Sequence, residues 1–512
     1  MIEPGFWVGV AVFLPALMGA ATPIVTRYWF KGRPEIFVAG VSAVVAFAVA
    51  MLAFAVLGGE NATLSVGGDL GIGEILRFSV DPLSLFVALI ASALWLLASI
   101  HAIEYMDHEH ARVRYSAVSL VALTAVLGTL FAGNLITLLI FFETVTLSCF
   151  VLVVHEQSDA AWEAGLLYIF LGIGAGISLL LALVSTMVQI GDLSITEIGV
   201  GLGDGRLELA IFCLFVLGFG IKAGLFPLHV WLPKAHPVAP SPASALLSGV
   251  VIKVGAYGLI RVLHVFWGSR ELIEPMIGPV QVVMVLAMIG IFLGSAVAMA
   301  QTDIKAMLAY SSISQIGYVI LGTTLLTPRG LTGGVLHIMN HGLIKSCLFL
   351  CAGIFVHNVG KRHVAELGGL GKKLPLTSIC FTLAALAMIG IPPLNGFVSK
   401  WMLALGALDV AETGFHGAGW GYAAVSVLLL SSLMNLVYYG PILYRVWFNE
   451  SESHHGEGHD EEAESSQNLE PTWRMLAPVT LLASGIVFFG VFPRWPLKVA
   501  EVIVEKLMGG LL

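Results

Sequence analysis

The sequence predicts an all-α polytopic membrane protein with about fourteen transmembrane helices. Hydrophobic residues make up 58% of the chain and charged residues only 11%, against about 25% charged in an ordinary soluble domain. Apolar runs of roughly 20 residues, long enough to cross a hydrocarbon core of about 30 Å, recur from residue 5 to about residue 493. The polar sequence between them leaves no room for a separate soluble domain, so we expect one helical bundle.

The first apolar run, FWVGVAVFLPALMGAATPIV, is expected to remain in the protein as a helix. Glu3 precedes it, and Arg27 and Arg33 follow it, the reverse of a signal peptide with its positive amino-terminal region. Thirteen similar runs follow. The expected spans are 5–25, 36–57, 83–105, 115–132, 134–154, 163–189, 208–228, 243–266, 278–300, 305–326, 331–357, 374–404, 420–447 and 475–493.

The distribution of lysine and arginine predicts the orientation of the bundle. Connections after even-numbered runs hold only Arg77, Arg206, Arg270 and Arg329. Cytoplasmic loops carry an excess of basic residues, so we expect a multi-pass protein of the cell (inner) membrane with both termini outside. The basic residues after odd-numbered runs are Arg27, Lys31, Arg33, Arg112, Arg114, Lys234, Lys361, Arg362, Lys372, Lys373, Arg445 and Arg474.

Two of the expected helices are interrupted at comparable places. The seventh run breaks at FPLHVWLPK, which contains Pro227, shortly after Lys222. The twelfth breaks at Pro392 and Pro393, shortly before Lys400. Broken helices at corresponding places in two halves are typical of transport proteins built from inverted repeats, and the spacing here fits two five-helix units. The expected divisions are 1–106 (three helices), 107–268 (first five-helix half-channel unit), 269–448 (second unit) and 449–512 (loop, last helix and tail).

Ionisable side chains lie well inside the apolar runs. Each costs roughly 2.5–3.5 kcal/mol at mid-membrane, so six unpaired groups would cost on the order of 15–20 kcal/mol. They therefore pair, change protonation state or line a hydrated path. Glu143 is the only acid among them and the natural partner of Lys222; a static ion pair is the alternative, but five lysines on five helices favour a proton relay. The six are Glu143, Lys222, Lys253, Lys305, Lys345 and Lys400.

Histidines accompany these charges. His337, His341 and Lys345 recur every four residues and would share one helix face. Imidazole gains or loses a proton near neutral pH, so this register favours a proton path over packing alone. His229 and His236 lie at the break after Lys222. Further candidates for the same polar path are Asp303, Ser311, Ser312 and Ser314, although serines in membrane helices often bond only to their own backbone.

No cofactor or metal is expected on the path. The five cysteines form no CxxC pair and all lie in apolar runs, which argues against an iron–sulfur cluster, a haem or a structural disulfide. The acidic stretch 449–471 is interpreted as a solvated cytoplasmic loop, with a weak metal site at His454, His455 and His459 as the alternative. The amphipathic tail after Pro496 would lie on the outer membrane face or against a partner subunit.

Five ordered motifs between about residues 80 and 445 resemble one family, the antiporter-like subunits of Mrp-type cation/proton antiporters, respiratory complex I and membrane-bound energy-converting hydrogenases. The wording of the last motif is most similar to the D-type subunits of Mrp antiporters. The motifs are FFETVTLSCF, KAGLFPLHVWLPKAHPVAPSPASALLSGVVIKVGAYGLIR, DIKAMLAYSSISQIGY, HIMNHGLIKSCLF and GIPPLNGFVSKW.

The resemblance implies two inverted half-channels joined by a central hydrophilic axis, within a complex of several subunits. It implies that Glu143 and Lys222 form the glutamate–lysine pair of the fifth and the broken seventh helix. The further correspondences it implies are Lys253 with the central lysine of the eighth helix, His337 and His341 with the relay of the eleventh, and Lys400 with the terminal residue of the twelfth.

Four functions are compared. The first is an ion-translocating subunit that exchanges protons for Na⁺ or K⁺ and has no catalytic site of its own. The second is a proton-pumping arm of a redox-driven complex, such as a NADH/quinone oxidoreductase or a membrane-bound hydrogenase. A membrane enzyme acting on quinone or lipid would need a catalytic cluster at the interface, and none is found; a scaffold would not need costly buried charges.

Overall fold

The computed structural model describes residues 3–30, 32–69, 74–191, 193–195, 205–266, 276–413, 417–449 and 469–509. Thirteen helices in these ranges are long and apolar enough to cross a membrane. The shorter apolar helix α16 is not among them. These helices confirm the expected all-α polytopic fold. The helices are α1 (Pro4–Tyr28), α2 (Pro34–Leu57), α3 (Pro82–Tyr105), η1 (Met106–His108), α4 (Arg112–Leu130), α5 (Leu135–Val153), α6 (Asp159–Ile190), α7 (Gly205–Ala223), η2 (Leu228–Trp231), α8 (Leu232–Val238), α9 (Ser241–Leu246), η3 (Leu247–Val251), α10 (Ile252–Arg261), η4 (Val262–Phe266), α12 (Ile277–Met299), α13 (Ile304–Thr324), α14 (Pro328–Val359), η6 (Val364–Glu366), α15 (Leu370–Lys373), α16 (Pro375–Ile389), α17 (Asn395–Thr413), α18 (Ala418–Phe448), α20 (Trp473–Val491) and α21 (Arg494–Met508).

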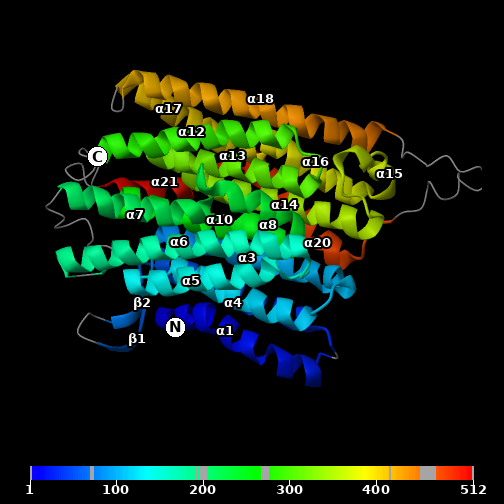
Figure 1. Ribbon diagram of the computed structural model, residues 1–512, viewed down its shortest axis with the longest axis horizontal. Helices are drawn as coiled ribbons and strands as arrows, with labels where there is room; N and C mark the ends of the chain where they lie inside the picture. The colour runs from blue at the N-terminus through cyan, green and yellow to red at the C-terminus, as the bar shows by residue number, and fades with distance from the viewer. Residues whose placement is uncertain are drawn as a thin grey trace, which may run out of the picture.

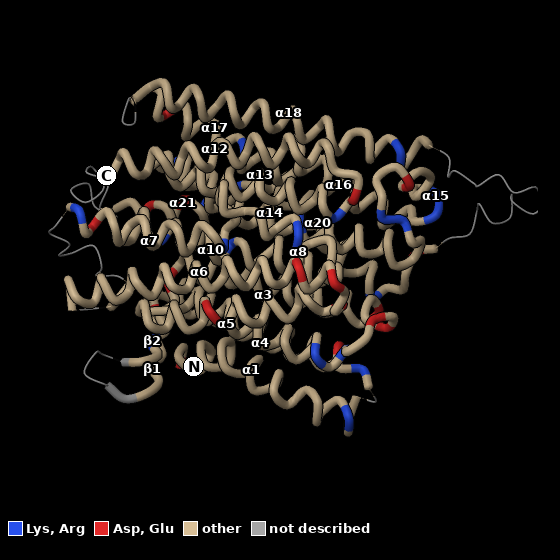
Figure 2. The backbone as a smooth tube through the Cα atoms, in the orientation of Figure 1, with Lys and Arg blue, Asp and Glu red and all other residues tan. Residues whose placement is uncertain are grey.

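The long helices run side by side along the longest axis of the molecule, with α1 at one edge and α18 at the other (Figure 1). Helix α20 returns from the end of the chain to pack against α3, α14 and α16, so it links the amino-terminal helices to the second half. Both termini lie at the same end of the bundle (Figure 1). Most Lys and Arg residues outside the spans gather at the opposite end, as Figure 2 shows. We call that opposite end the basic end.

The ends of the helices follow from local capping residues. The Asn134 side chain accepts a hydrogen bond from Thr137 N at 2.8 Å, which satisfies a free amide at the start of α5. Gly191 (φ 75°) ends α6 and Gly360 (φ 72°) ends α14 in the left-handed conformation, which glycine adopts without steric cost. Such local signals explain why the expected spans agree with the observed helices to within about five residues, except for the twelfth, which was expected to end at residue 404 whereas α17 continues to Thr413.

The seventh and twelfth helices are broken, as the sequence predicts. Helix α7 stops at Ala223, and the chain then turns through Gly224 (φ 77°) into η2 and α8. Helix α16 stops at Ile389, turns at Gly390 (φ 96°) and resumes as α17. The peptide bonds before Pro227 and before Pro393 are cis. Each break leaves the last carbonyl groups of a half-helix without intrahelical partners.

One element was not expected from the sequence. A two-stranded antiparallel hairpin, β1 (Ala62–Asp69) and β2 (Glu74–Val80), connects α2 to α3. The buried Phe78 of β2 contacts Phe13 of α1 and Phe141 of α5, with ring centroids 5.7 and 5.6 Å apart. The hairpin therefore covers the ends of the first helices on the same side as the termini.

The amphipathic tail forms α21, which packs on α14 and on η4 of the same chain. Its buried side chains include Ala500, Ile503 and Val504. The apolar face that was expected to meet a membrane surface or a partner is thus covered within the chain. The division expected at 268/269 and the histidine-rich segment with His454, His455 and His459 lie outside the described residues.

Candidate functional site

The first break places Lys222 in the last turn of α7, inside the bundle. Its Nζ donates to Thr146 Oγ1 at 2.7 Å and to the Tyr168 hydroxyl at 3.2 Å. The same ammonium group stands 5.0 Å from the ring centre of Phe142 and 5.1 Å from that of Tyr168. The carboxyl end of a helix and the faces of aromatic rings both favour a cation, so this position supports a buried positive charge without a contacting anion.

Glu143 lies near Lys222 but does not touch it. Among the described residues no ion pair joins the two side chains, and Glu143 Oε1 is buried without a hydrogen-bond partner. Thr146, one turn further along α5, takes the contact with Lys222 instead. The carboxylate lies over Gly176 of α6, where a Cβ atom would come within 2.1 Å of Oε1. The glycine therefore makes room for the carboxylate, which still interacts electrostatically with Lys222.

Lys253 stands at the middle of the eighth span, next to an irregular segment. Its Nζ donates to the Ser248 carbonyl in η3, a π-helical turn whose widened backbone frees that oxygen. The Ser248 hydroxyl lies 2.8 Å from the Ser312 hydroxyl of α13. This contact links the polar groups of the eighth span, which contains η3, to those of the tenth span, which is α13.

The histidines of α14 share a face, as their spacing predicts. The rings of His337 and His341 are parallel with centroids 5.8 Å apart. His337 Nδ1 lies 2.9 Å from Ser399 Oγ and its Nε2 lies 3.2 Å from Gln315 Oε1. His341 has no hydrogen-bond partner for either ring nitrogen among the described side chains.

Lys345, one turn further along α14, donates to the Leu308 carbonyl at 2.9 Å. Lys305 of α13 donates to the Ala239 carbonyl at 2.8 Å. Both side chains are buried. Like Lys253, these two lysines use backbone oxygens as partners.

At the second break, Lys400 reaches back from α17 to the carboxyl end of α16. Its Nζ donates to the carbonyls of Met388 at 2.6 Å and Ile389 at 3.2 Å, and it lies 5.1 Å from the ring centre of Tyr318. Asn435 of α18 also donates to the Met388 carbonyl, at 3.2 Å. The carbonyl groups that the break leaves free at the end of α16 are therefore the hydrogen-bond partners of Lys400.

Neutral polar residues that the sequence did not single out complete these contacts. The Tyr438 hydroxyl donates to Asn435 Oδ1 at 2.6 Å and lies 2.9 Å from Ser311 Oγ. Asn340 donates to the Asn395 carbonyl at 2.7 Å. The sequence shows that each of these polar residues lies within an apolar run. It does not show which residue on another helix is the hydrogen-bond partner.

The sequence analysis also missed a charged pair, which lies at the end of the eighth span near the β-hairpin. Arg261, only 6% exposed, pairs with Asp81 at 2.5 Å, and its guanidinium donates to the Tyr257 hydroxyl at 2.8 Å. Both Arg261 and Tyr257 stand within the motif KVGAYGLIR. The signal available was a basic residue inside an apolar run.

The remaining candidates lie towards the basic end. His229 is half-buried in η2, and the fully buried ring of His236 stacks on Phe349 with centroids 4.7 Å apart. Asp303 caps α13 by accepting from Ala306 N at 2.9 Å and forms an ion pair with Arg362. Asp303 therefore has an ion-pair partner, whereas the five buried lysines bond to neutral oxygens among the described residues.

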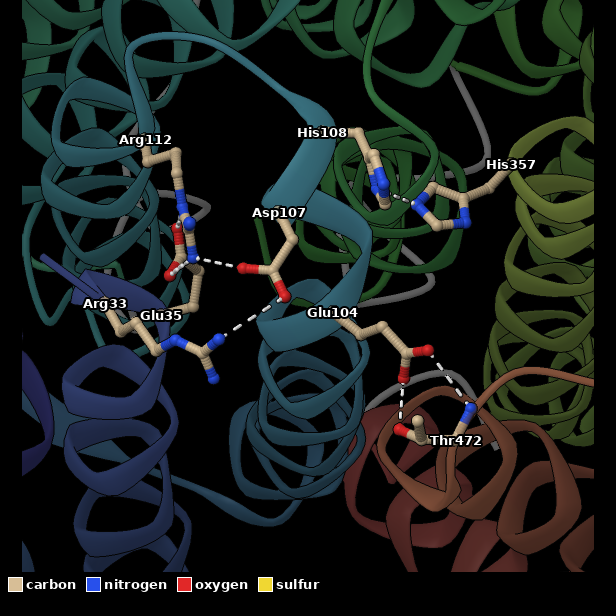
Figure 3. A network of polar contacts seen from close by, with 8 residues as sticks. All are labelled: Arg33, Glu35, Glu104, Asp107, His108, Arg112, His357 and Thr472. Carbon is tan, nitrogen blue, oxygen red and sulfur yellow. Dashed lines mark hydrogen bonds and ion pairs between the residues drawn. The ribbon is translucent and has the colours of Figure 1, made fainter.

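A separate network fixes the helix ends at the basic end (Figure 3). The Arg112 guanidinium makes two hydrogen bonds to the buried Glu35 carboxylate, at 2.9 and 2.7 Å, and pairs with Asp107 at 2.9 Å. Figure 3 also shows His108 against His357, with 2.8 Å between ring nitrogens. These contacts join the ends of α2, α3, α4 and α14, which is a structural role.

Comparisons with known proteins agree with this architecture. The family described as NADH:quinone oxidoreductase/Mrp antiporter matches residues 132–426. The NADH-quinone oxidoreductase subunit N of Desulforudis audaxviator is 32% identical over 491 residues, covering 94% of this chain and 95% of that protein. Hydrogenase-4 component B of Escherichia coli is 33% identical over 349 residues, which are 64% of this chain and half (50%) of that longer protein.

Among solved structures, a chain of the Mrp complex from Dietzia sp. superposes with a TM-score of 0.85, covering 98% of both chains at 22% sequence identity. At that identity the likeness concerns the fold. It extends over the amino-terminal helices, both broken helices and the last span, beyond the residues that the family description matches.

Proposed function

Because this chain belongs to the NADH:quinone oxidoreductase/Mrp antiporter family, we propose that it is an ion-translocating subunit of a multisubunit membrane complex and moves protons in exchange for Na⁺ or K⁺. The protons would pass along the buried lysines and histidines between the two broken helices. The partners would be other subunits of that complex, in a cell membrane with the basic end on the cytoplasmic side.

The observation that carries this proposal is the nature of the lysine partners. Among the described residues, the five buried lysines donate only to hydroxyl or carbonyl oxygens and form no ion pair. A lysine that only fixes helix packing needs a contacting carboxylate, because an uncompensated buried charge costs several kcal/mol. Neutral partners favour a different role, since the group can gain or lose a proton without leaving a contacting counterion unpaired.

Proton movement would then proceed by transfer between neighbouring groups. A proton that leaves Lys222 makes it neutral and is accepted further along, at Lys253 or at an imidazole of α14. Each transfer moves one positive charge and leaves the total unchanged. Lys400 would end the series at the second break, where the carbonyls of Met388 and Ile389 stabilise its protonated form.

Glu143 is the candidate for coupling to a second cation. Its Oε1 is buried and has no hydrogen-bond partner in the described chain. A Na⁺ or K⁺ ion that approaches this carboxylate would repel the charge on Lys222 and favour release of its proton. Exchange of one cation for another would follow from this competition.

A proton-pumping arm driven by a redox module is the second candidate. The nearly full-length similarity to a NADH-quinone oxidoreductase subunit favours it. The two candidates share the path and differ in the energy source. A Na⁺ or K⁺ requirement would select the first, and a requirement for an electron donor would select the second.

The test is proton flux in vesicles that contain the whole complex. We expect Lys222→Ala to reduce flux by at least about tenfold, within the range that positioned proton-transfer groups contribute, while the complex still assembles. Lys234→Ala is the matched control, because Lys234 lies after the same break but is exposed, and its ion-pair partner in the described part of the chain is the exposed Glu163. Equal flux in wild type and Lys222→Ala would exclude the proposed path.

A further inference from the structure

Three side chains with metal-binding groups meet at the basic end, apart from the buried path. Glu109 and His110 stand in the connection between α3 and α4, and His155 follows α5. One ligand atom from each lies within 4.8 Å of the other two. Neither the proposed relay nor the network of Figure 3 uses any of the three.

His155 is the unusual member of this group. It is 0% exposed, and neither ring nitrogen makes a hydrogen bond of normal geometry among the described residues, although the backbone of His110 lies close to the ring. Its ring stacks on that of His110, with centroids 5.2 Å apart and planes 22° apart, and meets the edge of Tyr115. Other buried histidines, His101, His236 and His341, also lack partners for both ring nitrogens among the described residues. His155 differs from them because a second imidazole and a carboxylate stand within ligand distance of its ring.

The charges around the group are mixed. The carboxylate of Glu156 lies close enough to that of Glu109 for the two to interact electrostatically. Two close carboxylates repel each other and attract a dication. Arg114 opposes this, since its Nη2 donates to the His155 carbonyl at 2.6 Å and holds a positive charge nearby. The side facing Glu109 and Glu156 is therefore the side where a cation fits.

The donor set of two imidazoles and one carboxylate selects the class of metal. Such mixed nitrogen and oxygen ligands suit Zn²⁺ and similar transition-metal ions, whereas Mg²⁺ and Ca²⁺ prefer oxygen alone. Tetrahedral ligands at about 2.0–2.2 Å from the metal stand roughly 3.3–3.6 Å apart, so the present group must contract. His110 is exposed and Glu109 is half-buried, and both lie outside the helices, in the connection between η1 and α4, whereas His155 is buried.

We propose that Glu109, His110 and His155 bind one Zn²⁺-class metal ion at the basic end of the bundle, with the fourth position open to water. The site joins the connection after α3 to the end of α5. It does not depend on the proposed ion exchange, because none of its ligands lies on the buried path.

The test is metal binding to the purified, intact complex. His454, His455 and His459 are first replaced by alanine to remove the competing histidine-rich segment, and this triple variant serves as the reference. Zn²⁺ affinity is measured by competition with a chromophoric chelator, and Co²⁺ is used as a spectroscopic probe. We expect one site in the reference and a tetrahedral Co²⁺ spectrum.

The ligand variants are made on that reference. We expect His155→Gln and His110→Ala each to weaken Zn²⁺ binding by at least about 100-fold, and Glu109→Gln by about tenfold, since loss of supporting groups alone costs 10–100-fold. His363→Ala is the control, an exposed histidine at the same end. Because His110 is exposed, its replacement leaves folding intact; unchanged affinity in His110→Ala, or no Zn²⁺ bound by the reference, would overturn the proposal.

Discussion

The two broken helices hold their lysines by different means. Lys222 bonds to side-chain hydroxyls of α5 and α6 and has the carboxylate of Glu143 nearby. Lys400 bonds to the backbone carbonyls that end α16, and no carboxylate contacts it within the described chain. At the first break a carboxylate therefore lies near the lysine, whereas at the second the lysine is stabilised by backbone carbonyl groups.

The two breaks nevertheless follow one physical rule. Lys222 precedes its break in the sequence and Lys400 follows its break. Lys222 lies in the last turn of the half-helix before its break, and the Lys400 ammonium group bonds to the last carbonyls of the half-helix before its own. That end carries partial negative charge from its unpaired carbonyls. Both lysines are thus associated with the carboxyl end of a half-helix. The two sites differ because a carboxylate, that of Glu143, lies near Lys222 and none contacts Lys400 among the described residues.

The largest effect is expected from removing the second lysine. If the two halves act in series, Lys400→Met reduces proton flux by at least about tenfold, as Lys222→Ala does, because either gap stops transfer. The double variant should then be no worse than either single one. Flux in vesicles containing the assembled complex gives the answer. Substantial flux in Lys400→Met would mean that the first half conducts without the second.

A smaller effect is expected when the first break is made to resemble the second. Glu143→Gln keeps the volume of the side chain and removes its charge, so Lys222 keeps only neutral partners. We expect proton flux to fall several-fold and to lose its dependence on Na⁺ or K⁺, measured across a series of salt concentrations.

Glu163→Gln is the control for that experiment, because Glu163 is an exposed carboxylate on the adjacent helix α6. It should leave both the flux and its cation dependence unchanged. A cation dependence that survives in Glu143→Gln would show that the carboxylate is not the coupling group.

The smallest effect is expected from removing Asn435, whose side chain bonds to the carboxyl end of α16 at the second break. Asn435→Ala removes an amide that donates to the Met388 carbonyl and accepts from Tyr438. Loss of buried hydrogen bonds that leaves partners unpaired costs about 1–3 kcal/mol, so we expect a lower melting temperature of the solubilised protein and a modest loss of flux.

Ser426→Ala, on the same helix α18, is the matched control. Ser426 is exposed and its hydroxyl bonds only to the Tyr422 carbonyl, so its loss should change stability by less than about 0.5 kcal/mol. An Asn435 variant as stable as this control would mean that Lys400 alone holds the end of α16.

Much of the fold could be predicted because its signals are local. The length of each apolar run, the basic residues between runs and the proline-containing breaks all act within a few residues of where they stand. The β-hairpin was missed because it lies between two long apolar runs, and that stretch was interpreted only as a connection between them. The covering of α21 by α14 was missed because an amphipathic pattern does not say what covers it.

The sequence by itself determined that five lysines and one glutamate lie inside a membrane protein, since apolar runs on both sides leave them no other place. Only the tertiary structure decided what each one touches. Thr146 rather than Glu143 contacts Lys222, and carbonyls of α16 rather than an acid contact Lys400, because the rotation and depth of each helix select the facing atoms. Helix rotation depends on packing along the whole bundle, which no short stretch of sequence records.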